Sequence, residues 1–269
     1  MTAAEATGLY VRPFGLARAE LLKLRKRRGL FWTVAALTVL PMIVAYGILA
    51  ILHATNPDHH GPAGGVANLG HGMSLLVLLG SIAAIIVGAN AGADDVTSGV
   101  FRELVITGRS RLALFSARIP GGLAFLLAFI AIAYAISALV SGLAHGYLIA
   151  PSVTLLIESA LWVIAETAFY FVLGLGLASL IGSRAYTIGI LFAWRLPIGH
   201  ILAAIGALGA YRAIVPDVPF AHLAPSAVEE YVNDLPHVGV SLETSVAALL
   251  LWAVVAAGVG AWRTATRDA

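Results

Sequence analysis

The chain has 269 residues, of which 60% are hydrophobic and only 11% are charged. A mean hydropathy of +0.93 exceeds what a soluble core of this size can bury, so the composition excludes a soluble domain and indicates a membrane protein. Because cysteine is absent, disulfides and thiolate metal sites are excluded. The pI near 9.0 is explained by membrane topology and anionic lipid, and we expect no nucleic acid as a partner.

The chain opens on a basic segment within residues 1–29, which we expect on the cytoplasmic side. Apolar residues recur there at three- and four-residue spacing, typical of an interfacial amphipathic helix: Phe14, Ala17, Leu21 and Leu24. The stripe would lie among the lipid headgroups while basic side chains meet anionic lipid: Lys23, Lys26 and Arg27. The alternative is that these residues only anchor the first span.

Six uncharged or nearly uncharged runs follow, each long enough to cross a hydrocarbon core of about 30 Å as a helix of roughly 20 residues. They are 30–53, 72–93, 119–144, 154–181, 185–208 and 244–262. The runs are continuous rather than alternating, which excludes a β-barrel. The sequence therefore predicts an all-α integral membrane protein with six transmembrane helices in one domain.

Basic residues are distributed unevenly between the two sides of the predicted membrane. Fourteen of the sixteen Lys and Arg residues precede the first span, follow the last one, or lie in the loops 94–118 and 182–184. Since cytoplasmic loops carry the excess of Lys and Arg, both termini are predicted to be cytoplasmic.

The outer loops offer two weaker patterns. Segment 209–243 contains Ser226 and Glu229 in the S-x-x-E capping spacing, which predicts a short outer helix at 227–234. Four outer histidines supply nitrogen donors that Zn²⁺ or Cu²⁺ would accept, although solvated loop histidines are the alternative: His53, His59, His60 and His71.

Loop 94–118 is the longest inner loop and is prone to form a helix. Phe101, Leu104, Val105 and Gly108 share one face of that helix. An apolar face on a cytosolic helix needs a partner, either a groove on another protein or the inner ends of its own bundle.

Two stretches, "AELLKLRKRRGLFW" and "DDVTSGVFRELVITGRSRLALFSARI", carry a resemblance. They are similar to the permease subunit of bacterial type-2 ATP-binding cassette (ABC) transporters, which are mostly exporters of the plasma membrane. In that family the inner loop has an acid, then Gly, Arg and Leu, and then Ser-Arg and a basic residue opening the third span. The matching residues here are Asp95, Gly99, Arg102, Leu104, Ser110, Arg111 and Arg118.

The resemblance implies that loop 94–118 contacts a separate ATPase subunit. The coupling residues would be Asp95, Gly99, Phe101, Arg102, Leu104 and Arg111. The chain contains no G-x-x-x-x-G-K-[ST] motif, so ATP and Mg²⁺ would bind to the partner and this chain would be neither an enzyme nor a cofactor carrier. A second permease copy or a homologous permease would complete the pathway.

Ionisable residues inside the spans suggest a second site. Glu166, Arg195 and His200 lie at similar predicted depths in the fourth and fifth spans, so we expect a buried polar cluster, with Glu158 nearer the outer surface. These residues are also the ingredients of a proton relay, so one alternative is an ion-coupled secondary transporter. A second alternative, a non-transporting scaffold or immunity protein, is disfavoured by the same buried charges, which are costly in a passive bundle. Gly88 and Gly92 form a G-x-x-x-G pair that favours close helix packing, within one subunit or between two.

Overall fold

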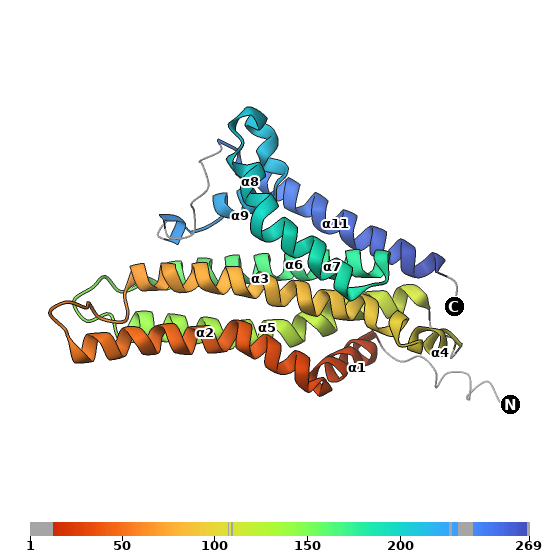
Figure 1. Ribbon diagram of the computed structural model, residues 1–269, viewed down its shortest axis with the longest axis horizontal. Coiled ribbons are helices and arrows are strands. Elements are labelled where there is room, and N and C mark those ends of the chain that lie inside the picture. The colour runs from red at the N-terminus through yellow and green to blue at the C-terminus, as the bar shows by residue number, and fades with distance from the viewer. Residues whose placement is uncertain (1–12, 107, 109, 226–227, 231–238, 268–269) are drawn as a thin grey trace.

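The computed structural model describes residues 13–106, 108, 110–225, 228–230 and 239–267. Within these ranges every regular element is a helix and none is a strand (Figure 1). In chain order they are α1 (Pro13–Lys26), α2 (Arg28–Thr55), α3 (Val66–Thr97), α4 (Val100–Ile106), α5 (Arg111–Leu143), α6 (Val153–Ile181), α7 (Arg184–Ala193), η2 (Trp194–Ile198), α8 (Gly199–Ala204), η3 (Gly206–Ile214), α9 (Asp217–His222) and α11 (Leu242–Thr266).

Six of the described helices are long and apolar enough to cross a membrane. They are α2, α3, α5, α6, the continuous stretch from α7 to α8, and α11. The prediction of an all-α protein with six spans is therefore confirmed. The N-terminal helix is also present, since α1 precedes the first span and lies at an angle to α2 (Figure 1).

Several helices run beyond the apolar stretches that predicted them. α3 continues to Thr97, and α5 begins at Arg111, where the Ser110 hydroxyl caps it by accepting a hydrogen bond from the Ala113 amide. Much of loop 94–118 is therefore helical. The first charged residue shows where an apolar run ends, but it does not show where the helix ends. The main-chain hydrogen bonds of the helix continue through charged residues whose side chains have partners.

The bundle has two distinct ends. The one that carries α1, α4 and the end of α11 is called the basal end here, and the opposite one, with the α2–α3 and α5–α6 connections, the distal end (Figure 1). Both the start of α1 and the end of α11 lie at the basal end. The first and last described helices thus reach the same end of the bundle, as an even number of spans requires.

The fifth span is irregular. α7 gives way to a π-helical turn, Trp194–Ile198, that contains Pro197. Proline has no N–H to donate to the carbonyl four residues earlier, and a π turn is one way in which a helix absorbs that loss. The span ends at Ala204, so the predicted limit of 208 is too long.

The chain between the fifth and sixth spans folds back onto the bundle as η3 and α9. η3 is interrupted at Gly209, whose φ of 51° is in the left-handed region that favours glycine. Of the outer helix predicted at 227–234, residues 228–230 are helical, and 227 and 231–234 lie outside the described residues.

α3 and α6 form the centre of the bundle, and glycines let them approach closely. A Cβ on Gly88 would come within 2.3 Å of the Phe171 carbonyl oxygen, and one on Gly92 within 2.6 Å of the Leu175 carbonyl oxygen. The G-x-x-x-G pair therefore packs α3 against α6 of the same chain. A larger residue would meet main-chain atoms, which cannot move aside as a side chain can.

We predict that Gly88→Leu lowers the thermal unfolding midpoint of the purified protein by several degrees or prevents its folding, because overpacking at a buried contact costs about 3 kcal/mol or more. Gly47→Leu is the control, since a Cβ at that position in α2 meets no atom within 4 Å. Thermal unfolding followed by size-exclusion chromatography in detergent measures both. Equal stability of the two variants would contradict the close packing.

Candidate functional site

Three charged side chains meet in the interior of the bundle. They are Glu166 of α6, Arg195 of the π turn η2 and Asp217 at the start of α9, and all three are buried. We call this set the buried charge cluster. It joins a span, a broken span and the folded-back outer segment at one point.

Arg195 is the centre of the cluster and uses each of its three nitrogens. Its Nη2 lies 3.1 Å from Glu166 Oε1, its Nη1 lies 2.8 Å from Asp217 Oδ1, and its Nε donates to Ser81 Oγ of α3 at 3.1 Å. Tyr170 adds a hydroxyl that donates to Asp217 Oδ1 at 2.9 Å and a ring whose centroid lies 5.3 Å from the guanidinium carbon. One guanidinium thus binds four elements of the fold together.

Asp217 is the member that the sequence reasoning missed. The positive-inside pattern placed it in the outer segment 209–243, outside the predicted spans. A possible signal was its position between Pro216 and Pro219 in a short apolar stretch, "IVPDVPF". The other carboxylate oxygen, Oδ2, is buried without a hydrogen-bond partner among the described residues, next to Gly199, where a Cβ would lie 2.3 Å from it.

Two of the predicted members lie elsewhere. His200 is exposed on α8, so the expectation that it joins Glu166 and Arg195 is wrong. Matching depths are not sufficient, because five positions along an ideal α-helix rotate a side chain by about 140° around the axis. Glu158 is exposed on α6, toward the distal end from Glu166.

A second set of charges lies at the basal end and ties four helices together. Asp95 Oδ1 lies 3.0 Å from Lys23 Nζ, and Asp95 Oδ2 lies 2.9 Å from Nη2 of the buried Arg118. Asp94 pairs with Arg27 and lies 3.9 Å from Arg184 Nη1. We call these six residues the basal ion-pair network; it connects the α1–α2 junction with α3, α5 and α7.

This network changes how two earlier expectations are understood. Lys23 and Arg27 were expected to meet anionic lipid, but they point into the bundle, because two buried carboxylates at the end of α3 require counter-charges. Asp95 was expected on the surface of loop 94–118, and it is instead buried within the network.

The remaining residues predicted in the coupling loop lie around α4. Gly99, with a φ of 74°, makes the turn between α3 and α4. Arg111 begins α5 and donates hydrogen bonds to the main-chain oxygens of Ala265, at 3.2 Å, and Arg267, so it anchors the end of α11. Phe101, Arg102 and Leu104 lie on α4, but their side chains are outside the described part of the structure.

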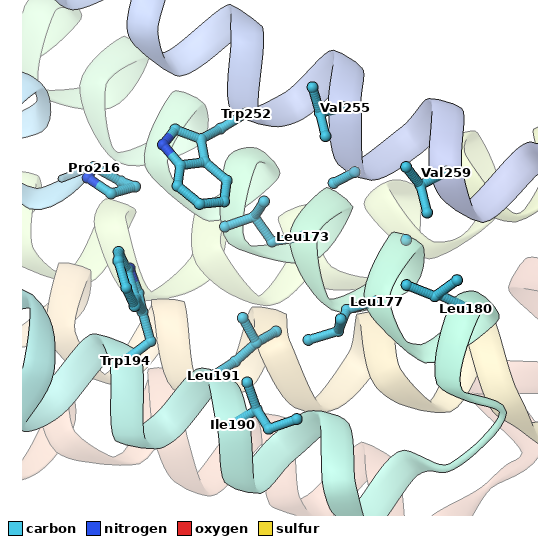
Figure 2. A pocket seen from close by; sticks show the side chains of 12 residues that line it. Leu173, Leu177, Leu180, Ile190, Leu191, Trp194, Pro216, Trp252, Val255 and Val259 are labelled. Atoms are coloured by element: carbon cyan, nitrogen blue, oxygen red, sulfur yellow. The ribbon is translucent and has the colours of Figure 1, made fainter. Parts of the chain in front are cut away.

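An apolar cavity of about 330 Å³ lies between α6, the α7–η2 stretch and α11. Figure 2 shows Leu173 and Leu177 on one side, Leu191 and Trp194 on a second, and Trp252 on a third. The Trp252 indole donates to the Ile214 carbonyl at 2.8 Å, so its N–H is already used. The lining therefore suits a hydrocarbon group, with the buried charge cluster one residue along the chain from Trp194.

The outer histidines form no recognisable metal site. Within the described ranges, no group of three or more His, Cys, Asp or Glu residues is placed to hold a metal ion. His53 Nδ1 lies 2.7 Å from the His60 main-chain oxygen, a contact that links the end of α2 to the following loop.

Six membrane-length helices with charged side chains buried between them define a multi-pass membrane protein. The family model "ABC-2 family transporter protein" matches residues 16–197, more than half of the chain. The chain therefore belongs to this family of transporter components, which are not themselves catalytic and which reside in the bacterial plasma membrane. No curated protein matches it.

We predict that Arg195→Gln lowers the stability of the purified protein by about 3–5 kcal/mol, because it leaves two buried carboxyl groups without a cation. Glu166→Gln/Arg195→Gln recovers only part of the loss, since Asp217 stays unpaired, and adding Asp217→Asn recovers more. Thermal unfolding midpoints of the single, double and triple variants measure this order, with His200→Gln as an unaffected control. Strictly additive losses would mean that the three residues do not interact.

Proposed function

We propose that the chain is the permease subunit of an ABC exporter, powered by a separate ATPase subunit that binds ATP and Mg²⁺. The family match supports the transporter class. The observation that supports coupling to an ATPase is the exposed position of α4 at the basal end. This seven-residue helix at the basal end leaves apolar side chains uncovered, with Val100 exposed at 44% and Ile106 at 71%. An ATPase groove at this end would cover them.

The position of α4 suggests how force would pass from the ATPase into the bundle. Only Ser98 and Gly99 separate α4 from α3, and the last turns of α3 carry Asp94 and Asp95. Through those carboxylates, a displacement of α4 would act on α1, α5 and α7 together. The coupling role proposed for Asp95 is therefore indirect: it positions helices and does not itself touch the ATPase.

We predict that Ile106→Asp abolishes permease-stimulated ATP hydrolysis and transport, because it puts a charge into the apolar contact with the ATPase. Membrane insertion and thermal stability should persist, since Ile106 is largely exposed. ATP hydrolysis of the co-expressed complex in liposomes and copurification of the ATPase measure the effect.

Ile149→Asp is the matched control, because Ile149 is equally apolar, is 80% exposed and lies in the α5–α6 connection at the distal end. Normal copurification and transport by Ile106→Asp would contradict the assignment of α4. A loss of function in both variants would point to a general effect on the bundle.

A second permease copy, or a homologous permease, is the other partner that we propose. Large apolar side chains are uncovered along α2 and α11, among them Trp32, Ile51, Leu251, Val254 and Trp262. Lipid or another permease would cover these faces. The ion-coupled alternative used Glu166, Arg195 and His200 as a proton relay, and the exposed position of His200 leaves that relay incomplete.

We propose that the basal end faces the cytoplasm, in agreement with the excess of basic residues there. The chain has no cysteine, so single cysteines report cleanly. Glu103→Cys at the basal end should resist an impermeant thiol reagent in intact cells, whereas His59→Cys in the α2–α3 connection should react. If position 103 is labelled in intact cells and position 59 is protected, the protein has the opposite orientation in the membrane.

A further inference from the structure

The helix α1 carries basic residues on two opposite faces, and only one of the faces is used within the protein. Lys23 pairs with Asp95 on the face that points into the bundle. Arg18 and Arg25 lie seven residues apart, about two turns, and so share another face, about 140–160° from Lys23 around an ideal helix. Both are exposed, and within the described part of the chain neither takes part in a hydrogen bond or ion pair.

A groove of about 540 Å³ lies directly beside these two arginines. Arg18, Leu22 and Arg25 form one wall, Phe31 of α2 closes one side, and α5 provides the floor. Along α5, Ala124, Ala128 and Ile132 recur every four residues and so form a stripe about 12 Å long.

The floor of the groove is firm and apolar. Phe129 is buried and makes edge-to-face ring contacts with Phe31, at 4.9 Å between centroids, and with Phe125, at 5.3 Å. Ala124 and Ala128 are small and exposed, so the groove is open between the larger side chains that border it. A hydrocarbon chain lying there would be in contact with carbon atoms along its length.

We propose that this groove is a binding site for one anionic phospholipid of the basal leaflet. The phosphate would be held by Arg18 and Arg25, whose guanidinium groups match phosphate in charge and geometry. One acyl chain would follow the stripe from Ala124 to Ile132 against Phe129. Two unpaired cations on the wall of an apolar trough have the complementary chemistry of such a lipid, and neither a soluble anion nor an uncharged lipid would satisfy both parts.

Binding at this place would also act on the basal ion-pair network. Lys23 and Arg27 are already engaged by Asp95 and Asp94, so the lipid would hold the outer face of α1 without competing for them. α1 would then be fixed from two sides, by carboxylates within the bundle and by a lipid phosphate outside it. This inference does not depend on the proposed ATPase or on the direction of transport.

The test uses the full chain, purified and stripped of lipid. It is titrated with phosphatidylglycerol or with phosphatidylcholine of the same acyl chains, and native mass spectrometry counts the bound lipid molecules. The wild type should retain one phosphatidylglycerol in preference to phosphatidylcholine. Arg18→Gln/Arg25→Gln should weaken that binding about 30-fold, because each basic residue near an anionic surface contributes about fivefold.

Lys26→Gln/Arg28→Gln is the matched control, since it removes the same charge from exposed positions nearby that do not line the groove. It should leave the bound phosphatidylglycerol in place. An equal loss in both double variants would mean that the overall positive charge of this region attracts the lipid, and would overturn the site. No preference for phosphatidylglycerol in the wild type would overturn it as well.

Ala128→Trp tests the apolar half without changing the charge. Ala128 is exposed, so the variant should fold normally, keep its retention volume in size-exclusion chromatography and lose the retained lipid because the indole fills the trough. If Ala128→Trp folds and still retains phosphatidylglycerol at the wild-type affinity, the arginines act alone and the groove is not a lipid site.

Discussion

Asp94 and Asp95 lie in the last turns of α3, the most buried of the described spans, and their buried charges require cations as partners. A carboxylate buried without a cation is strongly destabilising, so the chain brings Lys23, Arg27, Arg118 and Arg184 to this point. The positions of α1, α5 and α7 at the basal end follow from that requirement. α4, which follows α3 after the turn at Ser98 and Gly99, therefore starts from a helix end held by ion pairs.

The same constraint acts a second time near the centre of the bundle, with the signs reversed. Here Arg195 is the cation, and Glu166 and Asp217 are brought to it from α6 and α9. The π turn that carries Arg195 and the folded-back segment that carries Asp217 are both irregular, and each is stabilised by the contact with the other. Asp217 lies beyond residue 197, where the family match ends, so part of this cluster is contributed by a region that the match does not cover.

Between the two charged centres the bundle is held by close contact of main chains. Gly88 and Gly92 of α3 face α6, and Gly176 of α6 faces α11, where a Cβ would lie 2.2 Å from the Ala256 carbonyl oxygen. In a bilayer, apolar side chains gain little by leaving lipid for protein, so small residues that allow tight packing take over the role of a hydrophobic core. α6 is thereby fixed on both sides, and its Glu166 is held at a defined depth. By contrast, α2 and α11 leave large apolar faces to lipid or to a neighbouring permease.

The sequence by itself determined the class of protein, the six spans, the amphipathic α1 and the resemblance to the family that the match then established. These follow from the length and polarity of local segments, which a bilayer imposes without reference to tertiary contacts. Only the tertiary structure decided which charges meet. Depth along a span brought Glu166 and Arg195 together correctly but wrongly included His200, because depth alone ignores the rotation of side chains around the helix axis. Topology rules placed Asp217 in an outer segment and Lys23 among lipid headgroups, whereas both side chains pair with charges inside the bundle.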